Sequence, residues 1–218
     1  VLAYLPQSGV VHRGSTLMEE AESAFKRFDL LIGEKTEIEA SLEKTSENDD
    51  GLDSMLERHY EIEQLLLDAG YYRREEQIHR VLTGIGFTEK DFSRDTNEFS
   101  GGWQMRIALA KVLLEQPDAL LLDEPTNYLD LEARNWLEEY LLSYSGCLIV
   151  VSHDRYFLDS TVDSVAELWN SRLSTYTGNY TTYEKKRAAE LESIIAAYRK
   201  QQEEIAKMED FIRRFRYN

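Results

Sequence analysis

The chain has 218 residues, of which 42% are hydrophobic and 30% charged, and its formal net charge is −16. It has enough apolar residues for one good core with a smaller appended piece, and no run approaches the roughly 18 apolar residues that a membrane span needs. The acidic excess disfavours a protein that coats nucleic acid, because phosphates would be repelled over most of its surface. The single cysteine, Cys147, lies in the apolar run CLIVV and is expected to be buried, and the lack of an internal disulfide suits a reducing compartment.

Helices are predicted first along the chain. From Thr16 to about Ser46, apolar residues recur at three-to-four spacing, and the polar stretch TSENDDG separates this run from a second one between Leu52 and Ala69. Two antiparallel helices joined by a short polar turn predict a helical hairpin. A third, shorter helix, REEQIHRVLTGIG, leads into the stretch EFSGGWQMR.

Strand and helix patterns alternate after the paired glycines. WQMRIALAKVLLEQP predicts a helix that ends before Pro117, ALLLDEP a buried strand, LEARNWLEEYLLSY a helix and CLIVVSHD a second buried strand. This alternation predicts an α/β fold whose parallel sheet is covered on both faces. A short helix and the hairpin SVAELWNSRLSTYTG follow, and from Thr182 onward the pattern predicts one long charged helix.

Two carboxylates and a histidine stand at the predicted strand ends. A buried strand delivers Asp123 and Glu124 to the carboxyl end of the sheet, where ligands of parallel sheets bind. Asp123 can hold Mg²⁺, and Glu124 can orient and deprotonate a water for attack on a phosphoryl group. His153 ends the neighbouring strand and can donate a hydrogen bond to a terminal phosphate. The other histidines are expected to be surface or packing residues: His12, His59 and His79.

The stretch FSGG has the character of an anion-binding helix start. Ser100 supplies a hydroxyl, and Gly101 and Gly102 let the backbone approach a ligand closely. A helix cap with flexible glycines is the alternative. The 218 residues contain no P-loop, GxxxxGK[ST]; GEKT at 33–36 lacks its spacing and lies in an amphipathic helix.

Four short stretches, in the order YLPQ, SGGWQ, DEPTNYLD and SHD, resemble the second part of an ATP-binding-cassette nucleotide-binding domain. The spellings SGGWQMR, DEPTNYLD, SHDRYFLD and YTGNYTTY are similar to the ABC-F class, soluble proteins with two cassettes in one chain that act on ribosomes. The resemblance implies that Gln7 is the Q-loop glutamine, Asp123 the Walker B aspartate, Glu124 the catalytic base and His153 the switch histidine. It also implies that Mg²⁺ is held by Asp123 and Gln7, and that ATP is contacted by Gln7, Ser100, Gly101, Gly102, Gln104 and Asp130.

The resemblance also implies a division of the chain. Residues 1–14 would be the Q-loop end of the ATPase core, 15–98 a helical subdomain with an arm hairpin, 99–183 the signature to switch-histidine part, and 184–218 an inter-domain linker helix. The missing P-loop predicts a fragment that is inactive alone, cut from an ATPase in which ATP sits between two cassettes. In the signature, Phe99 stands where the family usually has leucine.

The implied partners are a second cassette, and the ribosome with its ribosomal RNA and transfer RNA, reached through arm and linker in the cytoplasm, with no membrane. In the tail FIRRFRYN, arginines suit phosphates, and Phe211, Phe215 and Tyr217 can stack or pack. Three alternatives stay open: the C-terminal half of a chromosome-maintenance ATPase, a membrane-transporter cassette, and a non-catalytic regulatory binding module.

Overall fold

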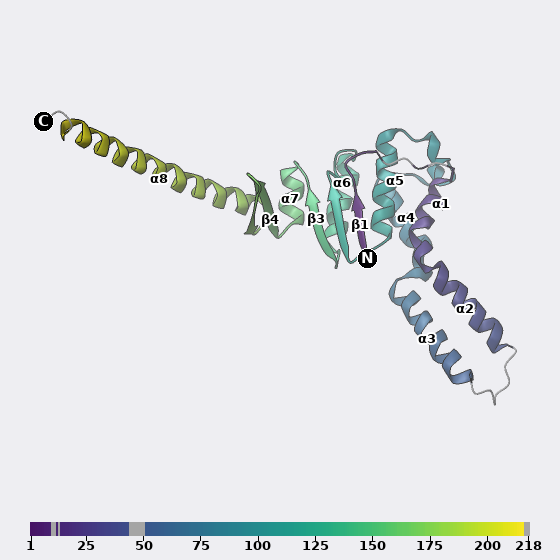
Figure 1. The fold of residues 1–218 in the computed structure, drawn as a ribbon. Helices are drawn as coiled ribbons and strands as arrows, with labels where there is room; N and C mark the ends of the chain where they lie inside the picture. The colour runs from purple at the N-terminus through teal and green to yellow at the C-terminus, as the bar shows by residue number, and fades with distance from the viewer. Residues whose placement is uncertain (10–11, 13, 44–50, 216–218) are drawn as a thin grey trace. The chain divides into compact units, whose positions relative to one another are not determined.

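The computed structural model describes residues 1–9, 12, 14–43 and 51–215. The chain divides into two compact units, Val1–His153 and Asp154–Asn218, and Figure 1 colours it from purple at the N-terminus to yellow at the C-terminus. The first unit contains a parallel sheet, the helices that pack on it and a helical hairpin. The described part of the second contains a two-stranded antiparallel sheet and two helices.

A three-stranded parallel sheet organises the first unit. Its strands, in spatial order, are β1 (Leu2–Leu5), β2 (Ala119–Asp123) and β3 (Cys147–Val151). Leu5 pairs with Leu122, and Asp123 pairs with Val151, so the three strands end at one edge. The predicted α/β class with a parallel sheet is confirmed, and the residues that follow these strands share the edge where ligands of such sheets bind.

The two faces of this sheet differ in burial. Side chains alternate between faces along each strand, and one face is buried through Ala3, Leu5, Leu120 and Leu122. The opposite face is exposed among the described residues, with Leu2 at 67% and Val151 at 58% of their full accessibility. Cover on both faces is therefore not seen in this part of the chain. The expectation of a buried Cys147 was wrong, because its position in β3 places it on the exposed face.

Helix α5 (Gly101–Leu114) is the centre of the first unit's core. It is buried along most of its length and contacts β1, α1 (Leu17–Glu22) and α4 (Arg74–Gly84). Helix α6 (Leu131–Leu142) packs on α4, at a point where Gly84 faces the ring of Trp136 so closely that no Cβ would fit. A 3₁₀ turn at Tyr71–Arg73 directly precedes α4, and two more, Glu89–Asp91 and Thr96–Glu98, lie between α4 and α5.

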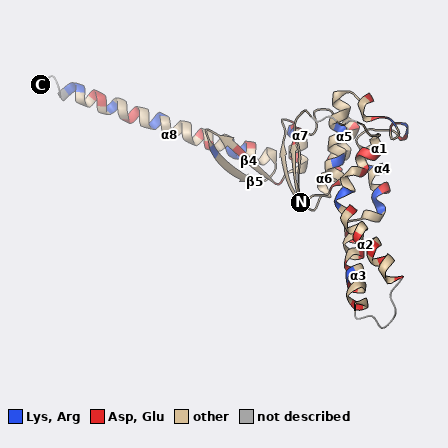
Figure 2. Cartoon of the chain, turned by 45° about the vertical axis from the view of Figure 1, so that its right-hand side comes forward, with Lys and Arg blue, Asp and Glu red and all other residues tan. Residues whose placement is uncertain are grey.

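The helical hairpin consists of α2 (Asp29–Leu42) and α3 (Leu52–Asp68), which pack against each other. Arg58 pairs with Glu34, and Lys35 pairs with Glu63, across the two helices, and Figure 2 shows the mixed charges along them. The predicted continuous helix from Thr16 was wrong: α1 gives way to a 3₁₀ segment, Ser23–Phe28, before α2 begins. Residues 45–50 of the expected polar turn lie outside the described residues.

The second unit begins with α7 (Arg155–Thr161) and the hairpin of β4 (Ser164–Trp169) and β5 (Arg172–Thr177). Asn170 and Ser171 both have positive φ, 49° and 60°, as a two-residue hairpin turn requires. The last helix, α8 (Tyr180–Phe215), confirms the predicted long helix.

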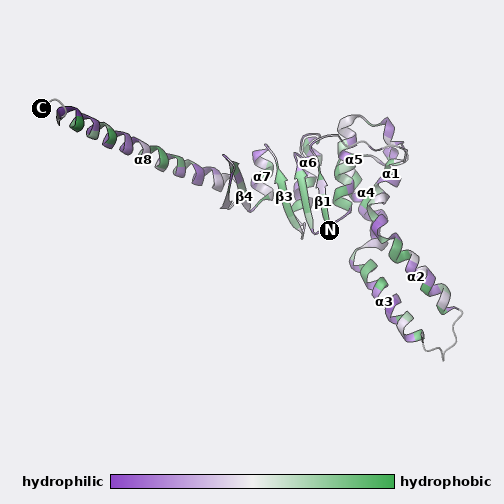
Figure 3. Cartoon of the chain, in the orientation of Figure 1, coloured by the Kyte–Doolittle hydropathy of each residue, from purple (hydrophilic) through white to green (hydrophobic). Residues whose placement is uncertain are grey.

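Hydrophobic residues recur along α8 (Figure 3). Those with exposed side chains are Leu191, Ile194, Ile195, Tyr198, Ile205, Met208, Phe211 and Ile212. Charged residues interrupt them, and none of the helices in the described ranges is long and apolar enough to cross a membrane. Of the aromatic residues expected to stack or pack, the side chain of Phe215 and the whole of Tyr217 lie outside the described part.

Candidate functional site

Glu124 and His153 meet at the carboxyl edge of the sheet. Glu124 directly follows β2 in a left-handed conformation, with φ 50°, and its N–H donates to the carbonyl of Val151 in β3 at 2.8 Å. Its side chain is only 13% exposed, and Oε2 lies 2.8 Å from Nδ1 of His153. The two residues that sequence reasoning assigned to one sheet edge are thus in direct contact, with the carboxylate buried and the imidazole 76% exposed.

Asp123 and Gln7 stand at the same edge. Asp123 is the last residue of β2 and is half-buried, and the exposed Gln7 follows β1 by two residues. No three His, Cys, Asp or Glu side chains group into a metal site among the residues described. Mg²⁺ at phosphate-transfer sites commonly takes one or two protein oxygens and completes its shell with phosphates and waters. The carboxylate of Asp123 and the amide oxygen of Gln7 are hard oxygen donors that fit this requirement.

The start of α5 has the features of an anion site. Ser100 occupies the N-cap position, but its side chain makes no capping hydrogen bond, and it is exposed together with Gly101. A Cβ on Gly101 would meet nothing within 4 Å, whereas one on Gly102 would lie 3.3 Å from the ring of Tyr128. The first backbone N–H groups of a helix have no partner within it, and the helix dipole favours an anion there.

An aromatic cluster fixes the loop that leads to Ser100. Phe99 is 9% exposed, and its ring lies 5.5 Å from Phe87 and 6.5 Å from Trp103, measured between centroids. The guanidinium of Arg94 covers Phe99 at 4.4 Å. Phe99 is therefore well packed, and the loop has a hydrophobic anchor beside the exposed Ser100 and Gly101.

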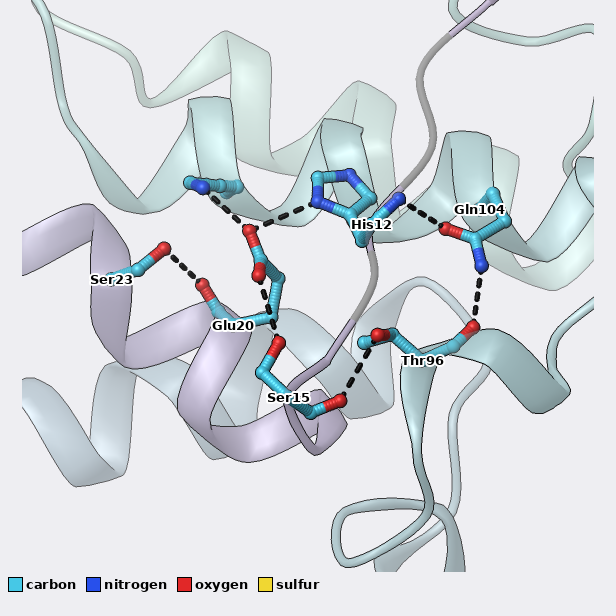
Figure 4. Close-up of polar contacts among 7 residues, drawn as sticks. His12, Ser15, Glu20, Ser23, Thr96 and Gln104 are labelled. Atoms are coloured by element: carbon cyan, nitrogen blue, oxygen red, sulfur yellow. Dashed lines mark hydrogen bonds and ion pairs between the residues drawn. The ribbon is translucent and has the colours of Figure 1, made fainter.

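The side chain of Gln104 is buried, unlike the exposed Ser100 and Gly101. It is 6% exposed; its Oε1 accepts from the backbone N–H of His12 at 2.9 Å, and its Nε2 donates to the carbonyl of Thr96 (Figure 4). Both ends of the side-chain amide are thus bonded inside the protein. Nucleotide contact by Gln104 stays a prediction, and what the geometry shows is a link between α5 and two loops.

Arg106 is a site residue that sequence reasoning missed. This arginine of α5 is 8% exposed and donates to the carbonyls of Tyr128 at 2.8 Å and Ile85 at 2.9 Å. It also pairs with Asp130 at 3.0 Å and stacks on Trp103 at 4.3 Å. A charged residue within the apolar run of α5 was the available signal, because a buried guanidinium needs several acceptors.

Asp130 is held by two partners. Its Oδ1 caps α6 by accepting from the N–H of Ala133 at 2.9 Å, and its Oδ2 accepts from Arg106 at 3.0 Å. The backbone hydrogen bond from Ala133, together with the hydrogen bond and charge of Arg106, lowers the pKa of Asp130 against the opposing effect of burial. The loop after β2 is thereby fastened to α5, the helix that begins at Gly101.

Comparisons with known proteins give a consistent answer. Residues 2–127 match the family described as "ABC transporter", and residues 166–218 match a second family with the same description. A solved structure titled "Structure of ATP binding subunit of ABC transporter" aligns with a TM-score of 0.55 at 19% identity, covering 81% of this chain and 58% of that chain. At that identity the match shows the fold alone.

Two curated relatives are more similar in sequence. "Putative ATP-binding protein YdiF" of Bacillus subtilis is 45% identical over 75% of this chain and 25% of its own length. "ABC transporter F family member 3" of Arabidopsis thaliana is 44% identical over 76% of this chain and 23% of its own length. The chain therefore spans about a quarter of the length of these two relatives.

Proposed function

The chain belongs to the ABC transporter family and carries part of its ATPase domain, and we propose that it is a segment of an ABC-F ATPase that couples ATP hydrolysis to the ribosome. The observation that carries the ATPase part is the group at the sheet edge. It consists of Asp123, Glu124 and His153 at the ends of two neighbouring parallel strands, with Glu124 and His153 2.8 Å apart.

This edge suits hydrolysis of a terminal phosphate. Glu124 orients a water and takes its proton as the water oxygen forms a bond to the γ-phosphorus and the bond to the bridging oxygen breaks. His153 steadies the carboxylate by donating from Nδ1, and donation from Nε2 to a phosphate oxygen as well requires both ring nitrogens to carry a proton. Asp123 and Gln7 would hold Mg²⁺, which when bound offsets negative charge on the phosphates.

The signature loop would serve a different ATP molecule. The hydroxyl of Ser100 and the uncovered backbone N–H groups at Gly101 can donate to a γ-phosphate. They stand on the outside of α5, where a second protein domain can bring its nucleotide. We propose that this lid closes over ATP held by a second cassette, with Gly102 and Asp130 forming the rest of the contact surface. Gln7, Asp123, Glu124 and His153 would attend the other ATP.

Assignment to the ABC-F class is supported by the motif spellings and by the 44% identity to a protein named as a family F member. The proposed division follows it: Q-loop end at 1–14, helical subdomain with arm at 15–98, signature to switch histidine at 99–183 and linker at 184–218. The arm would be the α2–α3 hairpin. Near the end of α8, the exposed Phe211 and the basic Arg213 and Arg214 suit contact with RNA bases and phosphates.

The test is turnover by the full-length protein with Glu124→Gln. We expect ATP hydrolysis to fall by about 100-fold or more, because the attacking water loses its base, and we expect more of the protein to sediment with ribosomes in ATP. Glu132→Gln, an exposed carboxylate on the first turn of α6, is the matched control and should hydrolyse normally. If turnover is unchanged in Glu124→Gln, this residue is not the base. If ribosome binding is unchanged, ATP hydrolysis is not coupled to the ribosome.

A further inference from the structure

The start of α8 is held against the β4–β5 hairpin by a network of charged and phenolic side chains. Oε1 of Glu167, in β4, accepts from the hydroxyl of Tyr183 at 3.1 Å and from Nε of Arg187 at 3.0 Å. Tyr176 of β5 donates from its hydroxyl to Glu190 at 2.8 Å. Tyr183, Arg187 and Glu190 follow one another at intervals of four and three residues, so they share one face of the helix.

A second side of α8 is bonded to α7. Oδ1 of Asp159 accepts from the backbone N–H of Thr181 at 2.6 Å, and Nη1 of Arg155 pairs with Glu184 at 2.9 Å. Because successive residues of an α-helix are rotated by about 100°, Glu184 lies on a different side of α8 from Tyr183. A helix that is held on one side can still tilt, whereas contacts on two sides oppose tilting in every direction. The start of α8 is therefore fixed in direction as well as in position.

Beyond Glu190, α8 is exposed on all sides. Every side chain from 191 to 214 is exposed, and the helix continues to Phe215 (Figure 1). At 1.5 Å per residue, the stretch from 191 to 215 is about 37 Å long, and a tilt of about 10° at its start displaces its end by about 6 Å. The location of Phe211, Arg213 and Arg214 is thus set by contacts at the opposite end of the helix.

We propose that Glu167 and Asp159 are positioning residues that set the direction of α8, so that its basic end reaches the ribosome. The proposal rests on the function given above, in which α8 is the linker that contacts RNA. Glu167 is central because one of its oxygens accepts from two residues of α8, and its side chain is only 18% exposed and that of Arg187 22%. Hydrogen bonds with such limited access to water are strong. Neither positioning residue belongs to the group proposed to hydrolyse ATP, so direction and turnover are separable.

The experiment uses the full-length protein with Glu167→Met and Asp159→Ala, each of which removes an acceptor for α8. Glu167→Gln keeps an oxygen at the same position and should behave as the unaltered protein. Glu192→Met, which removes an exposed carboxylate of α8 beyond the held part, is the matched control.

The first readout is the distance between two spin labels in the absence of ribosomes. One label replaces Ser174 of β5 and the other Glu209 of α8, both exposed, after all native cysteines, Cys147 among them, have been changed to serine. In Glu167→Met and Asp159→Ala, we expect the distance distribution to widen by about 6 Å, as a tilt of about 10° predicts. In Glu167→Gln and Glu192→Met it should stay as narrow as in the unaltered protein.

The second readout compares turnover with ribosome affinity. Without ribosomes, kcat and KM for ATP should stay within about twofold in all variants, because the reacting groups are unchanged. With a non-hydrolysable ATP analogue, the Kd for ribosomes should rise about tenfold in Glu167→Met, because a helix that is free to tilt must be ordered on binding. A merely structural role of Glu167 would instead lower kcat and thermal stability together with the affinity.

The outcomes separate this proposal from the proposed function. An unchanged distance distribution in both Glu167→Met and Asp159→Ala overturns the positioning role. A wider distribution with unchanged ribosome affinity shows that the direction of α8 does not govern binding, and so does an equal loss of affinity in Glu192→Met. If the unaltered protein does not bind ribosomes, the proposed function fails, whereas the distance measurement still decides whether Glu167 and Asp159 set the direction of α8.

Discussion

Nδ1 of His153 lies 2.8 Å from Oε2 of Glu124, which connects the residues that follow two neighbouring parallel strands. The contact pairs a side chain that is 76% exposed with one that is 13% exposed. The exposed imidazole of His153 thus holds the buried carboxylate of Glu124 in place. This arrangement suits a carboxylate that acts as a base on one water and an imidazole that donates to a phosphate.

The first prediction concerns this contact. His153→Ala in the full-length protein should lower kcat for ATP hydrolysis by at least about tenfold and change KM little, because the missing donor acts most strongly in the transition state. His79→Ala, which removes an exposed histidine paired with Glu89, is the control. A rise in KM with unchanged kcat would instead assign His153 to ground-state binding.

The second prediction concerns Arg106. Replacing it with methionine should lower the free energy of unfolding by about 3 kcal/mol, because two backbone carbonyls and Asp130 lose their buried donor. Arg58→Met removes an arginine that makes as many side-chain hydrogen bonds on the exposed hairpin and should cost much less, because exposed ion pairs contribute little to stability. If chemical denaturation gives the same loss in free energy of unfolding for both variants, the buried contacts of Arg106 are no more stabilising than exposed ones.

The third prediction concerns the approach of α4 to α6. Gly84→Ala places a methyl group into the ring of Trp136, so the helices must separate, and we expect a loss of about 1–3 kcal/mol. Gly33→Ala in α2 meets open space and should instead raise stability by up to about 1 kcal/mol, as alanine favours a helix more than glycine. Thermal unfolding of both variants gives the sign of each effect.

The fourth prediction concerns acid. Burial raises the pKa of Glu20, but hydrogen bonds from Lys111, Ser15 and His12 and the charge of Lys111 outweigh it and lower the pKa from 4.5 to about 2. A lowered pKa means that the carboxylate stabilises the fold above pH 4.5, and that this contribution disappears as pH falls toward 2. Its size at neutral pH is on the order of 3 kcal/mol at most.

Denaturant unfolding across pH checks this prediction. The difference in stability between the unaltered protein and Glu20→Gln should be constant above about pH 5 and should shrink steadily below it. Glu22→Gln, which removes an exposed carboxylate of α1, is the control. A difference that stays the same down to about pH 2.5 would show that Glu20 is not a charged partner of Lys111.

Much of the sheet edge could be predicted from sequence. Short apolar runs that alternate with helices indicate parallel strands. Residues that follow neighbouring parallel strands lie at the same edge of the sheet, so Glu124 and His153 are placed there however the helices pack. The helix start at Ser100 could also be predicted, because serine favours the N-cap position and an apolar run follows it.

Other features depend on tertiary packing and could not be predicted. The acceptors of Arg106 are carbonyls of Ile85 and Tyr128, which no side-chain pattern indicates. Gln104 was expected to contact ATP, yet its amide makes hydrogen bonds inside the protein with His12 and Thr96. The run from Thr16 has helical spacing throughout, but burial of Phe25 and Phe28 beside Tyr71 accompanies a 3₁₀ segment that interrupts the helix.

The nucleotide that remains bound to full-length Glu124→Gln tests the central claim most directly. After incubation with magnesium and ATP and removal of free nucleotide, we expect the variant to retain intact ATP, whereas the unaltered protein and Glu132→Gln retain ADP or none. Retention of ADP by Glu124→Gln in the amount found for the unaltered protein would contradict the account, because hydrolysis would then proceed without the carboxylate at the end of β2.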